Sequence, residues 1–421
     1  MADPERVPRL NECGKPTRRH YVILAMAWAG WLFDFYDLML LSFLLTPIKR
    51  DLGLGDWELS LLLGTTLAAT ALGGIFFGGL ADRFGRKKVL TWTLLTYSFG
   101  TFFCGLAHAF WVFLLFRIVT GLGVGGEWAT GQTLIGETFP ARMRARFAAV
   151  MQTGAPMGVL LAAVVGSFLE PVFTSLWGVG WGWRACFFVS VLPAVLVVFI
   201  RRHMPESDIW EGQKRAPSAV KLWVELRSDK VLRKLFFLGL VLALADMSAY
   251  WFTYTWMPKY LYDQLGFSLA RSGWWMIVTQ AAGLAGYLSY GFVADWGGRR
   301  WAYSLFSLVW ALGLIGITWF WGATGRLPWL PLVFMVLVGF GTGNFSGYGP
   351  IFSELFPTRI RSSAMGTAFN LSRGVQFFTP LIITWVATLP LARGHGLGAG
   401  ISIGAFFALF TGAWVWTLPE T

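Results

Sequence analysis

The chain has 421 residues, of which 56% are hydrophobic and only 13% are charged, and its formal net charge is +12. A soluble protein of this length would carry roughly 25% charged residues, so the composition excludes an ordinary soluble domain. The basic residues lie mostly in loops between apolar stretches, which argues against nucleic-acid binding and indicates membrane topology.

Twelve apolar stretches, each long enough to cross a bilayer as a helix, follow one another along the chain. They are continuously apolar rather than alternating, which predicts α-helices and not barrel strands. The expected fold class is an all-α polytopic membrane protein with twelve transmembrane helices. The predicted spans are 20–46, 60–81, 89–109, 111–136, 144–170, 184–201, 234–261, 271–294, 301–323, 329–353, 363–390 and 398–418.

The loop charges predict the orientation of these spans. When the N-terminal tail is placed in the cytoplasm, most Lys and Arg residues fall in loops on that same side. This asymmetry follows the positive-inside rule and predicts that both termini are cytoplasmic. The polar tail through His20 runs straight into the first span without a cleavable signal sequence. We expect a multi-pass protein of the cell membrane.

A few ionisable residues fall inside the predicted spans, where each costs several kcal/mol unless it is paired or hydrated. The first span carries Asp34 and Asp37, which share one helix face, and the fourth span carries Arg117 and Glu127. With a rise of about 1.5 Å per residue, Asp37 on an outward-running helix and Arg117 on an inward-running helix reach a similar depth. These residues are therefore candidate functional groups.

Two charged loop motifs each occur twice at a nearly constant spacing. The segment GGLADRFGRKK at 78–88 has a weaker copy, YGFVADWGGRR, at 290–300. The segment GETFPARMR at 136–144 returns as SELFPTRIR at 353–361. Short charged loops repeated between long apolar stretches predict a transporter built from two pseudo-symmetric bundles.

The repeats divide the chain into an N-terminal six-helix bundle at 1–201, a cytoplasmic linker at 202–232 and a C-terminal six-helix bundle at 233–421. Within the linker, residues 218–230 are compatible with a short amphipathic helix on the membrane surface or with a solvated loop.

The second half carries the sharpest candidate for substrate binding. Arg373 lies near the middle of the eleventh span, and Asp246 lies at a similar depth in the seventh. A guanidinium is always charged, and its planar fork fits a carboxylate through two hydrogen bonds. An arginine at that depth requires an anion, which either the substrate or Asp246 supplies. Further candidate cavity residues are Gln280, Tyr254, Tyr348, Asn370 and Gln376.

The complete loop motif at 78–88 resembles the signature of the major facilitator superfamily, and the resemblance extends over nearly the whole chain. The second copy departs from that signature at Trp296. The resemblance implies that the loop network locks one state of the carrier, with Gly78 allowing close helix approach. The gating residues so implied are Gly78, Asp82, Arg83, Gly85, Arg86, Glu137, Arg144, Asp295, Arg299, Glu354 and Arg361.

Shorter motifs narrow the resemblance within that superfamily. The Asp34-x-x-Asp37 pattern is similar to the first span of carboxylate–proton symporters for sialic acid, lactate and aromatic acids. In such carriers the first and fourth helices adjoin, which implies an Asp37–Arg117 proton-coupling pair with Asp34 and Glu127 as further proton sites. The seventh and eleventh helices flank the cavity, so we expect Asp246 to be the resting partner of Arg373. Pro205-Glu206-Ser207 instead resembles a sugar-porter element.

These patterns predict a secondary active transporter that carries a small organic monocarboxylate together with a proton by alternating access. The substrate class covers lactate-like, sialic-acid-like and aromatic acids, and the alternative is a sugar or polyol–proton symporter. We expect a monomer in the lipid bilayer that uses no cofactor beyond protons as a co-substrate. No nucleophile–base or metal-ligand constellation is visible, so an enzyme is not expected.

Overall fold

The structure is a computed structural model that describes residues 15–140, 147, 150–191, 194–195, 202, 206, 218–320, 327, 329–357 and 360–419. Every regular element in these residues is a helix. Of the linker predicted at 202–232, the structure describes Arg202, Glu206 and residues 218–232, and the others lie outside the described residues.

The first half of the chain contains long helices separated by tight turns. Gly53 ends the first helix in the left-handed conformation at φ 63°, and Gly85 makes the turn between the second and third helices at φ 101°. Such φ values favour glycine because a side chain would be strained there. The helices are α1 (Arg18–Leu52), α2 (Asp56–Phe84), α3 (Arg86–Gly105), α4 (Phe110–Thr138), α6 (Gly154–Val164), the π-helix η2 (Val165–Leu169), α7 (Glu170–Trp177) and α8 (Trp181–Val189).

The second half repeats this organisation after a short helix, α11 (Ser218–Ser228). Asp229 caps the next helix by accepting hydrogen bonds from the backbone N–H groups of Val231 and Leu232. The helices are α12 (Lys230–Tyr254), α13 (Met257–Asp263), α14 (Leu269–Gly297), α15 (Arg299–Trp319), α16 (Leu330–Gly341), η4 (Thr342–Gly347), α17 (Tyr348–Leu355), α18 (Arg361–Val375), α19 (Phe378–Thr388), η5 (Pro390–Ala392), α20 (Leu397–Ile401), α21 (Ile403–Trp414) and η6 (Val415–Thr417).

Nine helical segments among the described residues are long and apolar enough to cross a membrane. The other predicted spans correspond to α3, to α8 with undescribed residues beyond it, and to the eleventh span, which is divided into α18 and α19. The division occurs around Gln376, only a few residues after Arg373. The chain is thus an all-α polytopic membrane protein, and the predicted spans match its helices closely.

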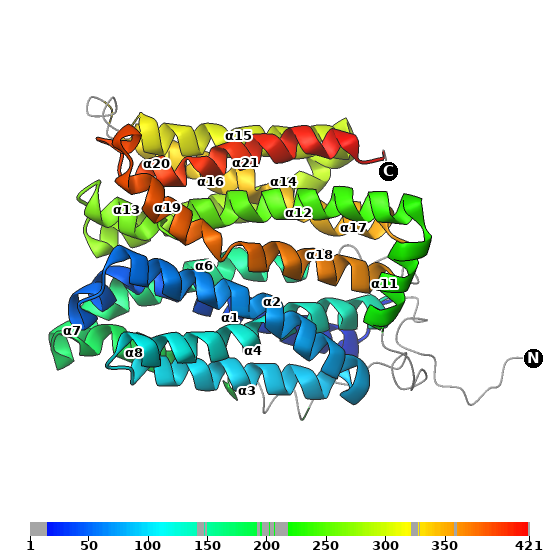
Figure 1. The fold of residues 1–421 in the computed structure, drawn as a ribbon, viewed down its shortest axis with the longest axis horizontal. Coiled ribbons are helices and arrows are strands. Elements are labelled where there is room, and N and C mark those ends of the chain that lie inside the picture. The colour runs from blue at the N-terminus through cyan, green and yellow to red at the C-terminus, as the bar shows by residue number, and fades with distance from the viewer. Residues whose placement is uncertain are drawn as a thin grey trace, which may run out of the picture.

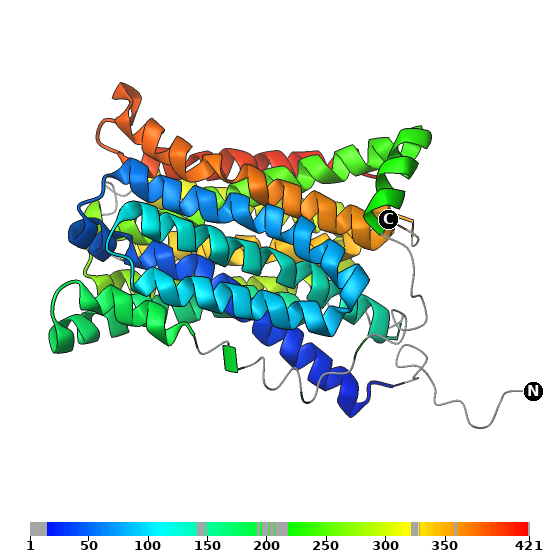
Figure 2. The ribbon, with the colours of Figure 1, turned by 60° about the horizontal axis from the view of Figure 1, so that its bottom comes forward.

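The helices are arranged in two groups that lie side by side. Figure 1 shows α1 to α8 in its lower part and α12 to α21 in its upper part. The groups meet where α2 packs against α18 and α19, and where α14 packs against α6. Figure 2 shows that the start of α1 and the end of the last helix lie at the same end of the molecule.

Matching glycines allow close helix crossings in both halves. A Cβ atom on Gly125 of α4 would overlap the carbonyl of Thr70 in α2, and one on Gly339 of α16 would overlap the carbonyl of Thr279 in α14. Small residues at such crossings let two backbones approach closely within a membrane. The two halves therefore resemble one another in packing as well as in their loop motifs.

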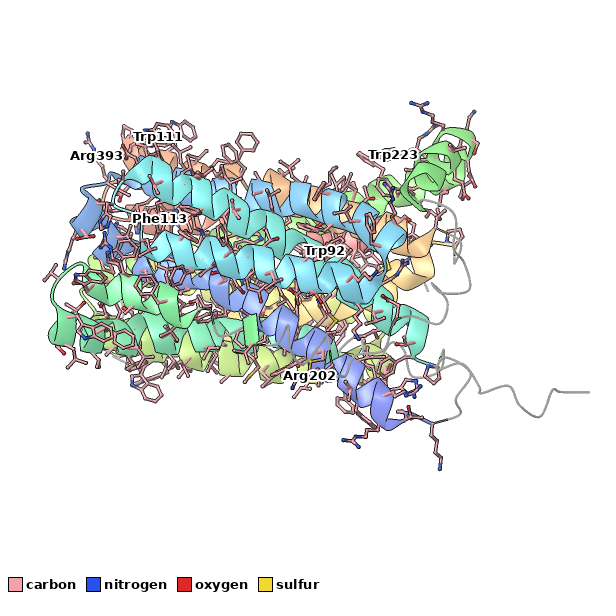
Figure 3. The ribbon with its side chains drawn as sticks, turned by 90° about the horizontal axis from the view of Figure 1, so that it is seen from below. Trp92, Trp111, Phe113, Arg202, Trp223 and Arg393 are labelled. Atoms are coloured by element: carbon pink, nitrogen blue, oxygen red, sulfur yellow. The ribbon has the colours of Figure 1, made fainter. Side chains whose placement is uncertain are left out.

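Large apolar side chains also cover the outer surface of the helices. Trp111 is 75% exposed and Trp92 is 38% exposed, and Figure 3 shows where they lie on the surface. Exposed aromatic residues are expected on a surface that faces lipid, and Trp is enriched near the membrane–water interfaces.

We predict that Gly125→Val destabilises the first half, because the added side chain would have to force α2 and α4 apart. Overpacking of this kind costs ~1–3 kcal/mol. The measurement is the thermal unfolding midpoint of the purified protein in detergent. The matched control is Gly79→Ala, where a Cβ would meet no described atom within 4 Å, and its midpoint should stay near that of the parent.

Candidate functional site

A buried ion pair joins α1 to α4 in the first half. The Nη1 atom of Arg117 lies 3.2 Å from Oδ2 of Asp37, and both side chains are at most 2% exposed. Thr101 donates a hydrogen bond of 2.6 Å to Oδ1 of Asp37, and Nε of Arg117 donates one of 3.1 Å to Oγ1 of Thr66. Both oxygens of Asp37 are therefore engaged, so its charge is compensated within the first half.

Two more carboxylates lie beside this pair without such compensation. Asp34 and Glu127 are 0% and 1% exposed, and neither has a hydrogen-bond partner for its oxygens among the described residues. The Glu127 carboxylate occupies the space beside Gly30 on α1, where a Cβ would overlap it. Gly30 precedes Asp34 by one helical turn, so the two acids interact electrostatically. Two buried carboxylates without hydrogen-bond partners among the described residues therefore lie close together where α1 meets α4.

Arg373 lies at the interface between the two halves, near the C-terminal end of α18. Its side chain is 1% exposed, and neither terminal nitrogen has a hydrogen-bond partner among the described residues. The guanidinium carbon lies 5.7 Å from the Trp31 ring centroid, 5.6 Å from that of Phe35 and 5.9 Å from that of Phe369. Aromatic faces attract a cation at these distances, but they leave its N–H groups without acceptors.

A small cavity opens beside this guanidinium. Both halves contribute to its wall, which is largely aromatic. Its free volume is about 20 Å³, which is enough for about one water molecule. The halves are therefore closed around the centre of the molecule in this conformation. The lining residues are Trp31, Phe35, Gln152, Ala155, Met247, Tyr250, Trp251, Tyr287, Phe345, Phe369 and Arg373.

The expected pairing of Arg373 with Asp246 is not found. Oδ1 of Asp246 instead accepts a hydrogen bond of 2.9 Å from Nδ2 of Asn344, and the carboxylate is fully buried. Its neighbour Met247 lines the cavity, whereas Asp246 does not. Depth along the helix was predicted from the sequence, but the direction in which α12 points its side chains was not. The acid that interacts electrostatically with Arg373 is Asp34 of the first half.

The other predicted substrate contacts are buried outside the cavity lining. Gln376 donates hydrogen bonds to Ser248 and to the Ser372 carbonyl, and it accepts one from Thr379. These bonds hold the break between α18 and α19. The other four predicted residues are also buried. Asn370 lies against Gly74, Tyr254 packs against Tyr250, and Tyr348 packs against Phe352. Gln280 lies within α14.

The loop between α2 and α3 is organised around the Gly85 turn. The backbone N–H groups of Arg86 and Lys87 donate to the carboxylate of Glu206, at 3.0 and 3.2 Å. The guanidinium of Arg86 donates to the Ala81 carbonyl. An acid at a helix N-terminus is favoured by the helix dipole, so Glu206 joins the segment after α8 to the start of α3. A Cβ on Gly78 would meet no described atom within 4 Å, so the close helix approach expected there stays a prediction.

The other predicted gating residues are only partly described. Arg83 and Asp295 are exposed, and Arg299 is half-buried with its carbonyl near the Tyr290 hydroxyl. Arg144 and the side chains of Asp82, Glu137, Glu354 and Arg361 lie outside the described residues.

Polar contacts connect the two halves at the end of the molecule away from the start of α1. Asp56 of α2 lies 2.7 Å from Nζ of Lys49 in α1 and 3.5 Å from Nζ of Lys259 in α13. Lys259 also pairs with Asp263. Ser60 of α2 contacts Thr384 of α19, with 2.5 Å between the two hydroxyl oxygens. These contacts were not predicted, because partners on different helices leave no local pattern in the sequence.

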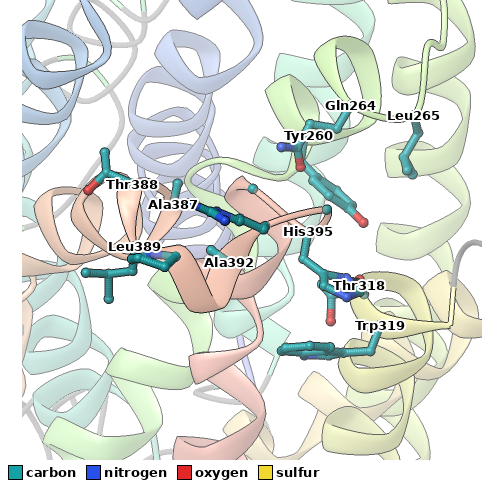
Figure 4. Close-up of a pocket in the computed structure, with 14 residues that line it drawn as sticks. Tyr260, Gln264, Leu265, Thr318, Trp319, Ala387, Thr388, Leu389, Ala392 and His395 are labelled. Carbon is teal, nitrogen blue, oxygen red and sulfur yellow. Dashed lines mark hydrogen bonds between the residues drawn. The ribbon is translucent and has the colours of Figure 1, made fainter.

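A larger cavity of about 750 Å³ lies in the second half alone. Figure 4 shows Tyr260, Gln264, Thr318, Trp319 and His395 around it. No residue of the first half lines it, so it does not lie between the halves. The described residues contain no group of three or more His, Cys, Asp or Glu that could hold a metal ion.

Most aromatic residues around Arg373 were not predicted. Trp31 and Phe35 flank Asp34 on α1, and Phe369 precedes Arg373 by one turn on α18. That helical spacing from a buried charge is a signal that could have identified them.

Comparison with known proteins gives consistent matches over nearly the whole chain. The Major Facilitator Superfamily profile matches residues 27–380. A cis,cis-muconate transport protein of Acinetobacter baylyi is 31% identical over 91% of this chain and 90% of its own length. A sialic acid transporter of Escherichia coli is 28% identical over 90% of this chain and 89% of its own. The crystal structure of a D-xylose–proton symporter has a TM-score of 0.77 at 20% identity, covering 95% of this chain and 98% of that one.

We predict that Ser60→Cys with Thr384→Cys forms a disulfide under mild oxidation in a background without Cys13, Cys104 and Cys186. The hydroxyl oxygens of the two residues are in contact, which places their Cβ atoms near the separation that a disulfide requires. Mass spectrometry of the linked peptides is the measurement. Ser60→Cys with the exposed Ser175→Cys is the control pair, and equal linkage in both pairs would contradict the closed contact.

Proposed function

Because the chain belongs to the major facilitator superfamily, we propose that it is a symporter that couples uptake of a small organic monocarboxylate to a proton by alternating access. It is a multi-pass membrane transporter rather than an enzyme. The proposal places it as a monomer in the cell membrane with both termini in the cytoplasm. The observation that carries the proposal is the environment of Arg373.

The unsatisfied guanidinium favours an anionic substrate. Its terminal nitrogens have no acceptor among the described residues, although it lies at the junction of the two halves. A buried donor without a partner is costly, and a carboxylate relieves that cost through a two-point hydrogen-bonded pair. Two relatives carry organic acids by name, cis,cis-muconate and sialic acid. Asn370 and Gln376, predicted to assist Arg373, have no place in this cavity, and Gln152 is the amide that lines it.

The aromatic wall favours a flat, partly apolar acid within that class. Trp31, Phe35 and Phe369 face the guanidinium, and Tyr250 and Trp251 contribute further rings. Such surfaces bind planar unsaturated or aromatic groups well and offer few hydrogen bonds to a polyhydroxylated molecule. We therefore favour an aromatic or unsaturated carboxylate over a sugar. The likeness to the xylose symporter, at 20% identity, concerns the fold.

Asp34 and Glu127 are the best candidates to carry the coupled proton. Both are buried and lack hydrogen-bond partners among the described residues, whereas Asp37 is engaged by Arg117 and Thr101. Asp34 interacts electrostatically with both Glu127 and Arg373. Protonating Asp34 would remove its electrostatic attraction to Arg373 and so favour binding of a substrate carboxylate to that guanidinium. The Asp37–Arg117 pair would fix α1 against α4 and remain a second protonation site.

In the proposed cycle, the two ligands add no net charge to the occluded state. A proton enters one of the acids on α1 and α4, and the substrate carboxylate docks on Arg373. The two ligands together are electrically neutral, which lowers the cost of closing the site in a low-dielectric interior. The contacts of Asp56 and Ser60 with the second half would have to break before the outer end opens. The loop around Gly85 would lock the opposite end of the molecule in the same way.

Replacing Arg373 should test the substrate assignment. We expect Arg373→Ala to abolish uptake of the substrate acid, and Arg373→Lys to weaken its binding by at least tenfold because lysine lacks the planar fork. The measurement is uptake into proteoliposomes with lactate, pyruvate, sialic acid, aromatic acids and hexoses, with and without an inward proton gradient. The control is Arg393→Ala, which removes an exposed arginine. Normal acid uptake by the Arg373→Ala protein would refute the assignment.

Replacing Asp34 should separate coupling from binding. We expect Asp34→Asn to lose proton-driven accumulation while retaining substrate counterflow. The amide occupies the same space as the carboxyl group but cannot bind and release a proton. Glu127→Gln should show the same separation to a lesser degree. Asp37→Asn should instead reduce the amount of folded protein, since removing one partner of a buried ion pair costs ~3–5 kcal/mol. Uphill uptake by Asp34→Asn in a proton gradient would count against its coupling role.

A further inference from the structure

A basic and aromatic patch lies where α11 meets the start of α12, outside the transport site. Six exposed side chains define this elbow patch: Trp223, Val224, Arg227, Lys230, Arg233 and Lys234. Figure 3 shows Trp223 at one end of the molecule and Arg393 at the opposite end. Figure 2 shows that α11 lies at the same end as the start of α1.

One face of α11 is fixed to the protein, and the opposite face is not. Leu222 and Leu226 are 0% and 6% exposed, whereas Trp223 and Val224 are 55% and 60% exposed. The helix contacts both α12 and α18. An aromatic ring and an aliphatic side chain are therefore held outward on an anchored helix. Outward apolar groups next to cations are typical of a helix that lies in the membrane interface.

The position of α12 sets the depth of the cations. Phe237 is 58% exposed on the apolar surface of α12. Lys234 and Lys230 precede it on the same helix face by about 4.5 Å and about 10 Å along the axis. If Phe237 faces lipid tails, the two ammonium groups reach the level of the headgroups. Long cationic side chains in this position extend toward the phosphate region.

The charges of the elbow patch are not compensated within the described protein. None of its four cations forms an ion pair with another described residue. The nearby Asp229 accepts two hydrogen bonds from the start of α12 through its Oδ1, and its single negative charge leaves the patch with a net positive charge. Glu225 is half-buried and already has an interaction partner. Four cations that form no ion pair with a described residue, next to an outward tryptophan, present a surface complementary to anionic lipid.

We propose that the elbow patch binds anionic phospholipids of the bilayer leaflet at this end of the molecule, with Trp223 seated among the headgroups. The four cations contact lipid phosphates, and zwitterionic lipid alone does not satisfy them. Because α11 contacts α18, bound lipid also restrains the helix that carries Arg373. This lipid site is independent of the substrate assignment.

Native mass spectrometry of the full-length protein in detergent tests the proposal. The probes are phosphatidylglycerol and phosphatidylcholine, each titrated separately. We expect the parent protein to retain phosphatidylglycerol in preference to phosphatidylcholine. The variant with Arg227→Gln, Lys230→Gln, Arg233→Gln and Lys234→Gln should lose most of this preference, with at least a fivefold drop in bound phosphatidylglycerol. Trp223→Ser should weaken retention of both lipids.

A charge-matched variant shows whether the effect is local. Lys15, Arg18, Arg19 and Lys88 are four exposed cations of the first half, and replacing them with Gln removes the same charge. This control should keep most of its phosphatidylglycerol. The proposal is overturned if the control and the patch variant lose lipid equally, if the parent shows no preference between the lipids, or if the patch variant binds lipid normally. Thermal unfolding of both variants verifies that the fold is retained.

Discussion

The constraint on which this structure depends is the cost of burying a charge in a membrane interior. The cost of burying the Arg117 charge is offset within one half of the molecule, by its contacts with Asp37 and Thr66. The cost of burying Arg373 is offset only in part, by the faces of three aromatic rings. The Arg117 guanidinium has a hydrogen-bonded anion, although its Nη2 has no hydrogen-bond partner among the described residues, whereas Arg373 has no hydrogen-bonded anion among them. This difference separates a group that braces the helices from one suited to bind a ligand.

Glycines make the polar centre possible. The carboxylate of Glu127 lies where α1 has Gly30, and the amide of Asn370 lies where α2 has Gly74. In both places a polar side chain from one helix fills the space that the absence of a side chain leaves on another helix. The same use of small residues closes the crossings of α2 with α4 and of α14 with α16. Close packing and buried polarity therefore depend on the same residue type.

The sequence predicted the fold well because long apolar runs and repeated loops are local signals. It also predicted the depth of Asp37 and Arg117, which the structure places in contact. Depth alone could not give the direction of a side chain around its helix. Asp246 therefore faces Asn344 rather than Arg373, and the rings around Arg373 went largely unnoticed. Contacts such as Asp56 with Lys259 join residues distant in sequence and leave no pattern.

The three rings around Arg373 have a consequence for a carrier that has released its cargo. If Arg373 binds the substrate carboxylate as proposed, the protein must reorient after release while this guanidinium is buried without an anion. Trp31, Phe35 and Phe369 substitute their π faces for part of the lost hydration. Under the proposed mechanism, these rings lower the free-energy cost of returning without substrate, so turnover need not wait for an acid to bind on the opposite side of the membrane.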